Sequence, residues 1–376
     1  MREPRLNTRC VRAAHVPDAA TGAIAEPIYL TTTFERDADG AYSRGYRYSR
    51  EGSPNRVALE SCMAALEGGI GAVAFASGLA ANMGVFELLG SADHVVAPLE
   101  AYYGTLRQLR EHARERGVAV DFANFADPSA VKAALRPRTR LVWIETPTNP
   151  LLSITDLALV AAMGHESGAL VVCDNTFATP VCQNPFDFGV DVIVHSGTKY
   201  LGGHSDVLSG LVVVREDGAV LERLQSWQRI CGAGLGAFDC WLLRRSIATL
   251  GIRVRTQCAS ALSIAKFLST HPAVERVYYP GLPQHPGHAV AAAQMPGGFG
   301  GVLSLCIARG SAAAMATVNR TRFFTPATSL GGVESLIEHR ASIEGPGSET
   351  PQNLLRLSIG IEDTEDLIED LSQALA

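Results

Sequence analysis

The sequence contains very little lysine, and this scarcity narrows the choice for any chemistry that depends on a primary amine. Only Lys132, Lys199 and Lys266 occur among the 376 residues, and the remaining members of the Lys/Arg total are arginines. A side-chain amine that attacks a carbonyl group must therefore be one of these three lysines.

Long apolar runs, blocks of like charge and paired cysteines are also missing. No apolar run approaches the roughly 18 residues that a membrane-spanning helix needs, and the net charge of −6 is not concentrated in one segment. These features argue against a membrane or nucleic-acid partner. The eight cysteines are scattered without a CxxC pair, which predicts reduced thiols in a cytoplasmic protein and no metal site. The polar first ten residues do not have the pattern of a secretory signal.

The composition and length fit a well-packed protein of two domains. Hydrophobic residues make up 47% of the chain and charged residues 19%, which is ordinary for a globular enzyme. Residues 1–50 have weak periodicity and many turn-forming residues, which predicts an arm that packs on another surface. We expect a large domain over 51–238 and a smaller C-terminal α+β domain over 239–376.

Seven short apolar runs alternate with helical segments between about residues 70 and 215. They are rich in β-branched residues and are bounded by Gly, Pro, Asn and Asp, which predicts an α/β fold with a mostly parallel central sheet. The predicted strands are Gly71–Ala76, His94–Pro98, Val118–Phe122, Arg140–Glu145, Ala169–Asp174, Asp191–His195 and Ser209–Val214. Because ligands bind beyond the carboxyl ends of such strands, we expect the site there.

The remaining elements are predicted from helical periodicity and from stop signals. A helix over Asn55–Leu66 is expected to end at Gly68, and one long helix is expected from about Phe238 to Thr270. The other predicted elements are the strands Gly301–Ile307 and Leu354–Ile359 and the helices Gly310–Asn319 and Glu365–Ala374.

Lys199 stands apart from the other two lysines. Lys132 and Lys266 lie in segments with helical periodicity, where a solvated surface position is the ordinary outcome. Lys199 instead follows an apolar strand, and glycines and hydroxyls surround it in the segment His195-Ser196-Gly197-Thr198-Lys199-Tyr200-Leu201-Gly202-Gly203. On this motif alone a surface lysine in a turn is an equal alternative. A desolvated amine near other cations would be a nucleophile toward a carbonyl.

Two further polar motifs follow predicted strands. Asp174 ends a buried strand, where a carboxylate is costly unless it is paired; it either binds a protonated ring nitrogen or caps a helix. Ser77-Gly78-Leu79 follows a strand and opens a helix, so that its backbone N–H groups form either an anion site or a plain turn.

Tyr102 and Arg356 complete the set of candidate residues. Tyr102 follows a strand end, where its ring either stacks on a flat ligand or packs against the core. Arg356 lies inside an apolar strand and needs an acceptor, which is either a substrate carboxylate or an internal acid. A reactive amine, a ring-nitrogen acid, a phosphate cradle, a stacking ring and a carboxylate clamp together form the site that a pyridoxal phosphate (PLP) enzyme needs for an amino acid.

These segments resemble the Cys/Met-metabolism PLP-dependent enzymes, a family that includes cystathionine γ-synthases, cystathionine γ-lyases and methionine γ-lyases. The resemblance covers almost the whole chain and implies a PLP-dependent transferase fold of the aspartate aminotransferase type, with pyridoxal 5'-phosphate as cofactor. The matching segments include Tyr48-Ser49-Arg50, Leu66-Glu67-Gly68-Gly69, Ala76-Ser77-Gly78-Leu79, Glu145-Thr146-Pro147-Thr148-Asn149-Pro150, Asp174-Asn175-Thr176, Ser196-Gly197-Thr198-Lys199-Tyr200, Ser329-Leu330-Gly331-Gly332 and Leu354-Leu355-Arg356-Leu357-Ser358.

The resemblance implies how the cofactor is held. Lys199 resembles the lysine that forms a Schiff base with it, Asp174 the partner of its ring nitrogen, and Tyr102 the ring that stacks on it. The residues that resemble a phosphate cradle are Gly78, Leu79, Ser196 and Thr198, joined by Tyr48 and Arg50 from a neighbouring subunit. A homo-oligomer follows from this sharing, and the family implies a tetramer of two such dimers.

On the substrate side, Asn149, Ser329 and Arg356 resemble the binding residues, with Arg356 on the α-carboxylate. The implied reaction is γ-replacement on an activated homoserine derivative by a thiol, and the alternative is γ-elimination from cystathionine, methionine or a related thioether. Thr328 stands where many cystathionine enzymes have Glu, and Tyr103 stands where the family usually has Gly. Gly104, in place of a cysteine, argues against a methionine γ-lyase.

Two other classes of protein are disfavoured by the sequence. A nicotinamide dehydrogenase would need GxGxxG after a strand with an acid about 20 residues later, and the glycine clusters at 232–236 and 297–301 lack that spacing. A non-catalytic scaffold of the same fold would not need the complete set of chemical residues.

Overall fold

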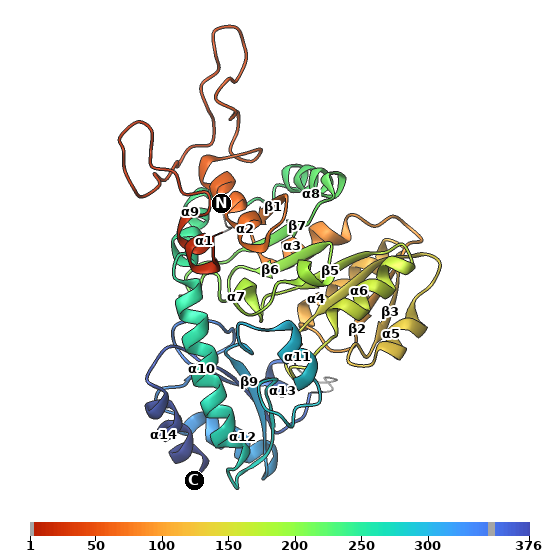
Figure 1. Ribbon diagram of the computed structural model, residues 1–376, viewed down its shortest axis with the longest axis vertical. Coiled ribbons are helices and arrows are strands. Elements are labelled where there is room, and N and C mark those ends of the chain that lie inside the picture. The colour runs from red at the N-terminus through yellow and green to blue at the C-terminus, as the bar shows by residue number, and fades with distance from the viewer. Residues whose placement is uncertain (1–3, 345–349) are drawn as a thin grey trace.

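The computed structural model describes residues 4–344 and 350–376, which form two β-sheets connected by a long helix (Figure 1). The larger sheet has the order β1-β7-β6-β5-β4-β2-β3. Strands β6, β5, β4, β2 and β3 run parallel, whereas β7 is antiparallel to both of its neighbours, β1 and β6. The strands of this sheet are β1 Gly71–Phe75, β2 His94–Pro98, β3 Ala119–Ala123, β4 Thr139–Glu145, β5 Leu170–Asp174, β6 Val192–Ser196 and β7 Gly210–Val214. The predicted α/β fold with a mostly parallel sheet is confirmed.

Both faces of the larger sheet are buried, which explains why its strands appear in the sequence as unbroken apolar runs. Val142 and Val171 pack in one hydrophobic cluster, whereas the adjacent Trp143 and Val172 pack in the other, on the opposite face. The helices associated with this sheet are α2 Pro54–Glu67, α3 Gly78–Phe86, α4 Tyr103–Arg107, the π-helix η1 Gln108–Ala113, α5 Pro128–Ala134, α6 Leu157–Glu166, α7 Thr179–Cys182, the 3₁₀-helix η2 Pro185–Phe188 and α8 Gly218–Cys231.

The predicted long helix over residues 238–270 is wrong, because two helices occupy that stretch. Helix α9 (Ala237–Ile247) ends and α10 (Leu250–Ser269) begins within three residues. The guanidinium of the buried Arg253 donates to Ser246 O at 3.0 Å and to Tyr200 O at 2.8 Å. The break is therefore stabilised by a side chain that satisfies a carbonyl group at the end of α9, a contact that helical periodicity cannot reveal.

The smaller sheet has the order β10-β11-β12-β9-β8 and is antiparallel apart from the short β10–β11 pair. Strands β8 and β11 were not predicted from the sequence. The elements of this part are β8 Val274–Tyr278, α11 His288–Gln294, β9 Val302–Ile307, α12 Gly310–Arg320, β10 Thr325–Pro326, β11 Leu336–His339, α13 Arg340–Glu344, β12 Leu354–Ser358 and α14 Thr364–Leu375. The division at residues 50 and 238 stays a prediction.

Residues 4–50 contain one short helix, α1 (Leu6–Arg12), which contacts α10 and which the weak periodicity did not predict. The rest of this segment forms extended loops that project from the body of the molecule (Figure 1). Val16 and Leu30 are more than three-quarters exposed, at 76% and 78%. Apolar side chains in such loops are typical of a segment that packs on a partner.

Within residues 4–344 and 350–376, no helix is long and apolar enough to cross a membrane. The same described residues contain no group of His, Cys, Asp and Glu side chains that could hold a metal ion.

Candidate active site

A cavity of about 390 Å³ lies at the carboxyl ends of β4, β5 and β6, where the sequence predicted the site. It extends to residues of the smaller sheet, so both parts of the molecule form its wall. Tyr48 and Arg50 do not line it. The predicted residues that line it are Gly78, Leu79, Tyr102, Asn149, Asp174, Ser196, Thr198, Lys199, Ser329 and Arg356.

Lys199 is the one lysine among the described residues that line this cavity. Its Nζ donates a hydrogen bond to Ser329 Oγ at 2.9 Å. Burial, reinforced by the nearby Arg356, lowers the pKa of Lys199 from 10.5 to about 8, although Glu338 partly opposes the shift. The alternative of a surface lysine is therefore wrong, and much of this amine is neutral near pH 8.

Ser329 links the lysine to the arginine clamp. Its φ of 89° is in the left-handed region, which is uncommon for a residue other than glycine and costs backbone energy. In this conformation its hydroxyl accepts from Lys199 while its carbonyl accepts from Arg356 Nη2 at 2.9 Å. The strained residue therefore fixes the two cationic groups relative to each other.

Asp174 and Glu145 lie side by side, as register partners at the ends of β5 and β4. Asp174 Oδ1 accepts a hydrogen bond from Thr176 N at 3.0 Å. The next helix along the chain, α7, begins only at Thr179, so the alternative that Asp174 caps a helix is wrong. Burial raises the pKa of Asp174. Burial, and then the charge of Asp174, raises the pKa of Glu145 well above its usual value. A cation beside this acidic pair, such as a protonated ring nitrogen, would stabilise it.

The anion cradle is formed by the start of α3 against the end of β6. Gly78 and Leu79 are the first residues of this helix, so their N–H groups have no acceptor within it. A Cβ atom on Gly78 would lie 3.0 Å from Ser196 Cβ, which explains the glycine. Thr198 Oγ1 already bonds with the backbone of Ser209, at 3.2 and 3.0 Å. Open N–H groups, a helix N-terminus and the Ser196 hydroxyl fit a phosphate group.

Arg356 is held by an internal acid, which is one of the two acceptors that the sequence left open, and by an amide oxygen. Its Nη1 donates to Asn149 Oδ1 at 2.9 Å, and its Nη2 lies 2.6 Å from Glu338 Oε2. The internal salt bridge is therefore present, and the guanidinium still lines the cavity. A buried guanidinium with this support is a preorganised site for a carboxylate.

Tyr102 presents its ring to the cavity, and its backbone N–H donates to both oxygens of Glu145 at 3.0 and 2.9 Å. Burial, followed by the neighbouring Tyr103, raises the pKa of Tyr102 to about 12. A Cβ atom on Gly104 would lie 2.6 Å from Tyr102 Cε1, so the absence of a side chain at position 104 leaves room for the Tyr102 ring. The phenol keeps its proton at neutral pH and can donate it.

Tyr48 and Arg50 lie on the projecting arm, away from the cavity of their own chain. Arg50 Nη1 donates to Arg229 O at 3.1 Å, and its guanidinium lies 5.5 Å from the centre of the Tyr48 ring. Any contact of these two residues with a phosphate must therefore involve another copy of the chain, and this role stays a prediction.

Sequence reasoning missed Glu145, Glu338 and Arg340 as site residues. Glu145 was noted only within its motif, although a carboxylate at the end of a buried strand is as informative there as at Asp174. Glu338 was missed because its strand, Leu336–His339, is short and was not predicted. The requirement that Arg356 have an acceptor was the available signal for it.

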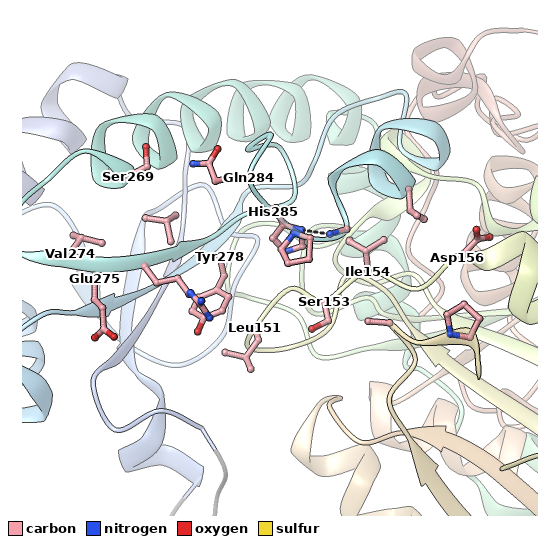
Figure 2. A pocket seen from close by; sticks show the side chains of 17 residues that line it. Leu151, Ser153, Ile154, Asp156, Ser269, Val274, Glu275, Tyr278, Gln284 and His285 are labelled. Carbon is pink, nitrogen blue, oxygen red and sulfur yellow. Dashed lines mark hydrogen bonds between the residues drawn. The ribbon is translucent and has the colours of Figure 1, made fainter. Parts of the chain in front are cut away.

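A second cavity, of about 630 Å³, lies between β8 and the segment that follows β4 (Figure 2). Its central imidazole, His285, accepts a hydrogen bond from Gly287 N at 3.1 Å, and burial lowers its pKa. Asp156 is engaged as the cap of α6. The described residues that line this cavity include no lysine or cysteine. Its larger volume therefore does not make it the better candidate for chemistry.

A parallel α/β sheet with a buried lysine, a paired acid and a phosphate cradle at its carboxyl edge defines a PLP-dependent enzyme. The comparison with known families agrees: the chain belongs to the Cys/Met metabolism PLP-dependent enzymes, whose family model matches residues 7–376. PLP is therefore the cofactor, and the cradle, the acid and the lysine described above fit it.

Individual relatives carry different reaction names. Cystathionine gamma-synthase of Mycobacterium tuberculosis is 47% identical, over 98% of this chain and 96% of its own length. Cystathionine gamma-lyase of Bacillus subtilis is 44% identical, over 99% of both chains. The crystal structure of metB from Corynebacterium glutamicum has a TM-score of 0.96 at 43% identity, covering 99% of this chain and 98% of the other. The reaction within the family is therefore not decided by similarity.

Proposed function

We propose that this enzyme catalyses γ-replacement, in which a thiol takes the place of the γ-substituent of an activated homoserine derivative. The observation that carries the proposal is the position of the Lys199 amine, whose pKa is lowered, in the cavity. This amine lies 2.9 Å from Ser329 Oγ, and Arg356 and Asp174 line the same cavity. The relative named cystathionine gamma-synthase supports replacement. The relative named cystathionine gamma-lyase keeps γ-elimination as the second candidate.

Cofactor binding is assigned to residues of three strand ends and one helix. In this proposal Lys199 holds PLP covalently and Asp174 binds its ring nitrogen. Tyr102 covers the ring, while Gly78, Leu79, Ser196 and Thr198 bind the phosphate. When bound, the electron-withdrawing ring stabilises negative charge at the α-carbon of the substrate.

The substrate is oriented by the arginine clamp and then loses protons to the lysine. Arg356, supported by Asn149, binds the α-carboxylate and directs the α-carbon toward Lys199. The free Lys199 amine takes the proton from the α-carbon. Once it has passed that proton on to the conjugated system that the cofactor would supply, the neutral amine takes a second proton from the β-carbon, which weakens the bond to the γ-substituent. Tyr102 donates a proton to the leaving group as the bond to the γ-carbon breaks. A thiol then gives its proton to the Tyr102 oxygen while its sulfur bonds to the γ-carbon, and Lys199 returns protons to the β- and α-carbons.

Completion of the site by a second copy is also proposed, since Tyr48 and Arg50 belong to the N-terminal segment and do not line the cavity of their own chain. These two side chains would reach the phosphate of a neighbouring subunit. A homo-oligomer, with a dimer as its smallest active unit, follows from this arrangement.

A substrate panel separates the two candidate reactions. With an O-acylhomoserine and cysteine, we expect thioether to form at least about tenfold faster than 2-oxo acid is released, because the intermediate is captured by the thiol. Thioether is measured by chromatography and 2-oxo acid by a coupled dehydrogenase. Cystathionine or methionine as the preferred substrate, with 2-oxo acid as the main product, would instead establish γ-elimination.

The lowered pKa of Lys199 predicts how cofactor binding depends on pH. Only the neutral amine attacks an aldehyde, so incorporation of PLP into cofactor-free protein should accelerate up to about pH 8 and then level off. An ordinary lysine, with a pKa near 10.5, would keep accelerating well above that pH. The measurement is the rate of PLP incorporation, followed by the absorbance of the bound cofactor, over the range from about pH 6.5 to about pH 10, which extends nearly to the pKa of an ordinary lysine.

A further inference from the structure

Arg340 is a buried cation in the active-site wall that neither the sequence motifs nor the mechanism above uses. It begins α13, directly after β11, and only 3% of it is exposed. Together with Arg356 it lines the cavity that holds Lys199. The α-carboxylate of an amino acid needs only one of these two arginines.

The guanidinium of Arg340 is incompletely paired. Its Nε donates to Glu344 Oε1 at 2.7 Å and its Nη1 donates to Glu338 Oε2 at 3.1 Å. Its Nη2 is buried and has no hydrogen-bond partner among the residues that the structure describes. Because a buried donor without an acceptor is costly, this nitrogen calls for an acceptor from a ligand.

The sign of the charge on this part of the wall favours an anion. Glu338 and Glu344 do not line the cavity, so the arginines face the ligand space while their carboxylates lie behind them. Glu145 and Asp174 are the acidic side chains among the described lining residues, and both stand at the ends of β4 and β5.

The rest of the wall near Arg340 is uncharged. It is contributed by Tyr103, Thr328 and Ile343. A ligand that extends past Lys199 toward the smaller sheet therefore meets a cation without a facing acid.

Tyr103 positions this arginine. The Arg340 guanidinium lies 5.7 Å from the centre of the Tyr103 ring, which in turn lies 4.8 Å from the Tyr102 ring. Tyr103 is about half exposed, at 48%, so its ring can turn aside and open the guanidinium to the cavity. The stack of two rings and a cation orients Arg340, and a turn of the Tyr103 ring would expose its unpaired Nη2 to a ligand.

We propose that Arg340 forms a second anion subsite, which selects substrates whose γ-substituent carries a negative charge. A dicarboxylic acyl ester or a phosphate ester of homoserine has that charge, whereas an acetyl ester does not. This inference rests on the proposed function for the identity of the substrate, but the subsite itself is defined by charge and can be tested by binding alone.

The binding test uses a matched pair of unreactive amino acids and the PLP-loaded enzyme. 2-Aminoadipate and norleucine have chains of equal length and differ in a terminal carboxylate in place of a methyl group. We expect calorimetry to show that the enzyme binds 2-aminoadipate at least about tenfold more tightly, because a charged hydrogen bond is gained. Equal affinities in the native enzyme would overturn the proposal whatever the variants do.

Variants assign the preference to Arg340. Arg340→Gln should remove most of the tenfold preference and leave norleucine binding unchanged, and Arg340→Lys should keep part of it. Arg107→Gln is the matched control, because it makes the same change of charge at a surface position. Arg107 is at the end of α4, the helix that begins with Tyr103, and it is paired with Glu111 with 74% of its side chain exposed. A preference that persists in Arg340→Gln would assign the anion to another group and overturn the proposal.

Turnover measurements distinguish a carboxylate from a phosphate as the negative group that the subsite binds. The ratio of kcat/KM for O-succinylhomoserine or O-phosphohomoserine to that for O-acetylhomoserine should fall about tenfold in Arg340→Gln. A fall for only one anionic ester identifies which anion the subsite accepts. If no ester forms a thioether while the binding preference holds, the proposed function fails and the subsite stands.

Discussion

Replacing Lys199 with alanine is expected to lower turnover by about four orders of magnitude or more, since one residue supplies both the cofactor attachment and the general base. No other lysine among the described lining residues is available to replace it. The variant should also lose the near-visible absorbance of the bound cofactor. Steady-state kinetics with the preferred homoserine ester and an absorbance spectrum of the purified protein measure the two effects.

The matched control for this change is Lys266→Ala. Lys266 is exposed on α10, and removing it should leave both turnover and absorbance unchanged. Circular dichroism on both variants shows whether the fold is retained. A Lys199→Ala enzyme with native turnover would refute the assignment of the nucleophile and base to this residue.

Replacing Arg356 with alanine is expected to raise KM for the amino-acid substrate by about ten- to a hundredfold, because charged hydrogen bonds to a carboxylate contribute roughly 1.5–3 kcal/mol. The effect should be almost as large in Arg356→Lys, since a lysine keeps the charge but cannot form two parallel hydrogen bonds. Initial rates over a range of substrate concentrations separate KM from kcat.

The fold should survive this substitution. Glu338 would keep the Arg340 Nη1 at 3.1 Å as a partner, so no carboxylate is left buried alone. Cofactor absorbance and thermal melting therefore serve as controls that should change little. An unaltered KM in Arg356→Ala would remove this residue from the substrate site and leave it a structural role, through its contacts with Glu338, Asn149 and Ser329.

The strands of the larger sheet could be predicted because burial on both faces makes each a continuous apolar run. Their predicted ends differ from the structure by at most one residue, and His94–Pro98 is identical. Strand β8 (Val274–Tyr278) could not be recognised in this way, because the charged Glu275 and Arg276 on it are exposed. The break between α9 and α10 depends on the tertiary contact of Arg253, which leaves no local pattern in the sequence.

The site could be predicted to the extent that its residues follow strand ends. Lys199 and Asp174 each stand at such a position, and the parallel topology brings them into one cavity. Glu338 lies on β11 of the smaller sheet and Arg340 follows that strand directly, and Arg340 reaches the cavity only through the packing of the two parts. Their charges are balanced within the wall, so no single segment of sequence reveals them.

The assignment of the cofactor to Lys199 can be tested directly, because the chain has only three lysines. Treating the PLP-loaded enzyme with borohydride fixes the cofactor to its amine, and mass spectrometry of a digest then locates it. We expect a reduced pyridoxyl group on the peptide with Lys199 and none on the peptides with Lys132 or Lys266. Cofactor fixed to either of those lysines, or to no lysine at all, would contradict it.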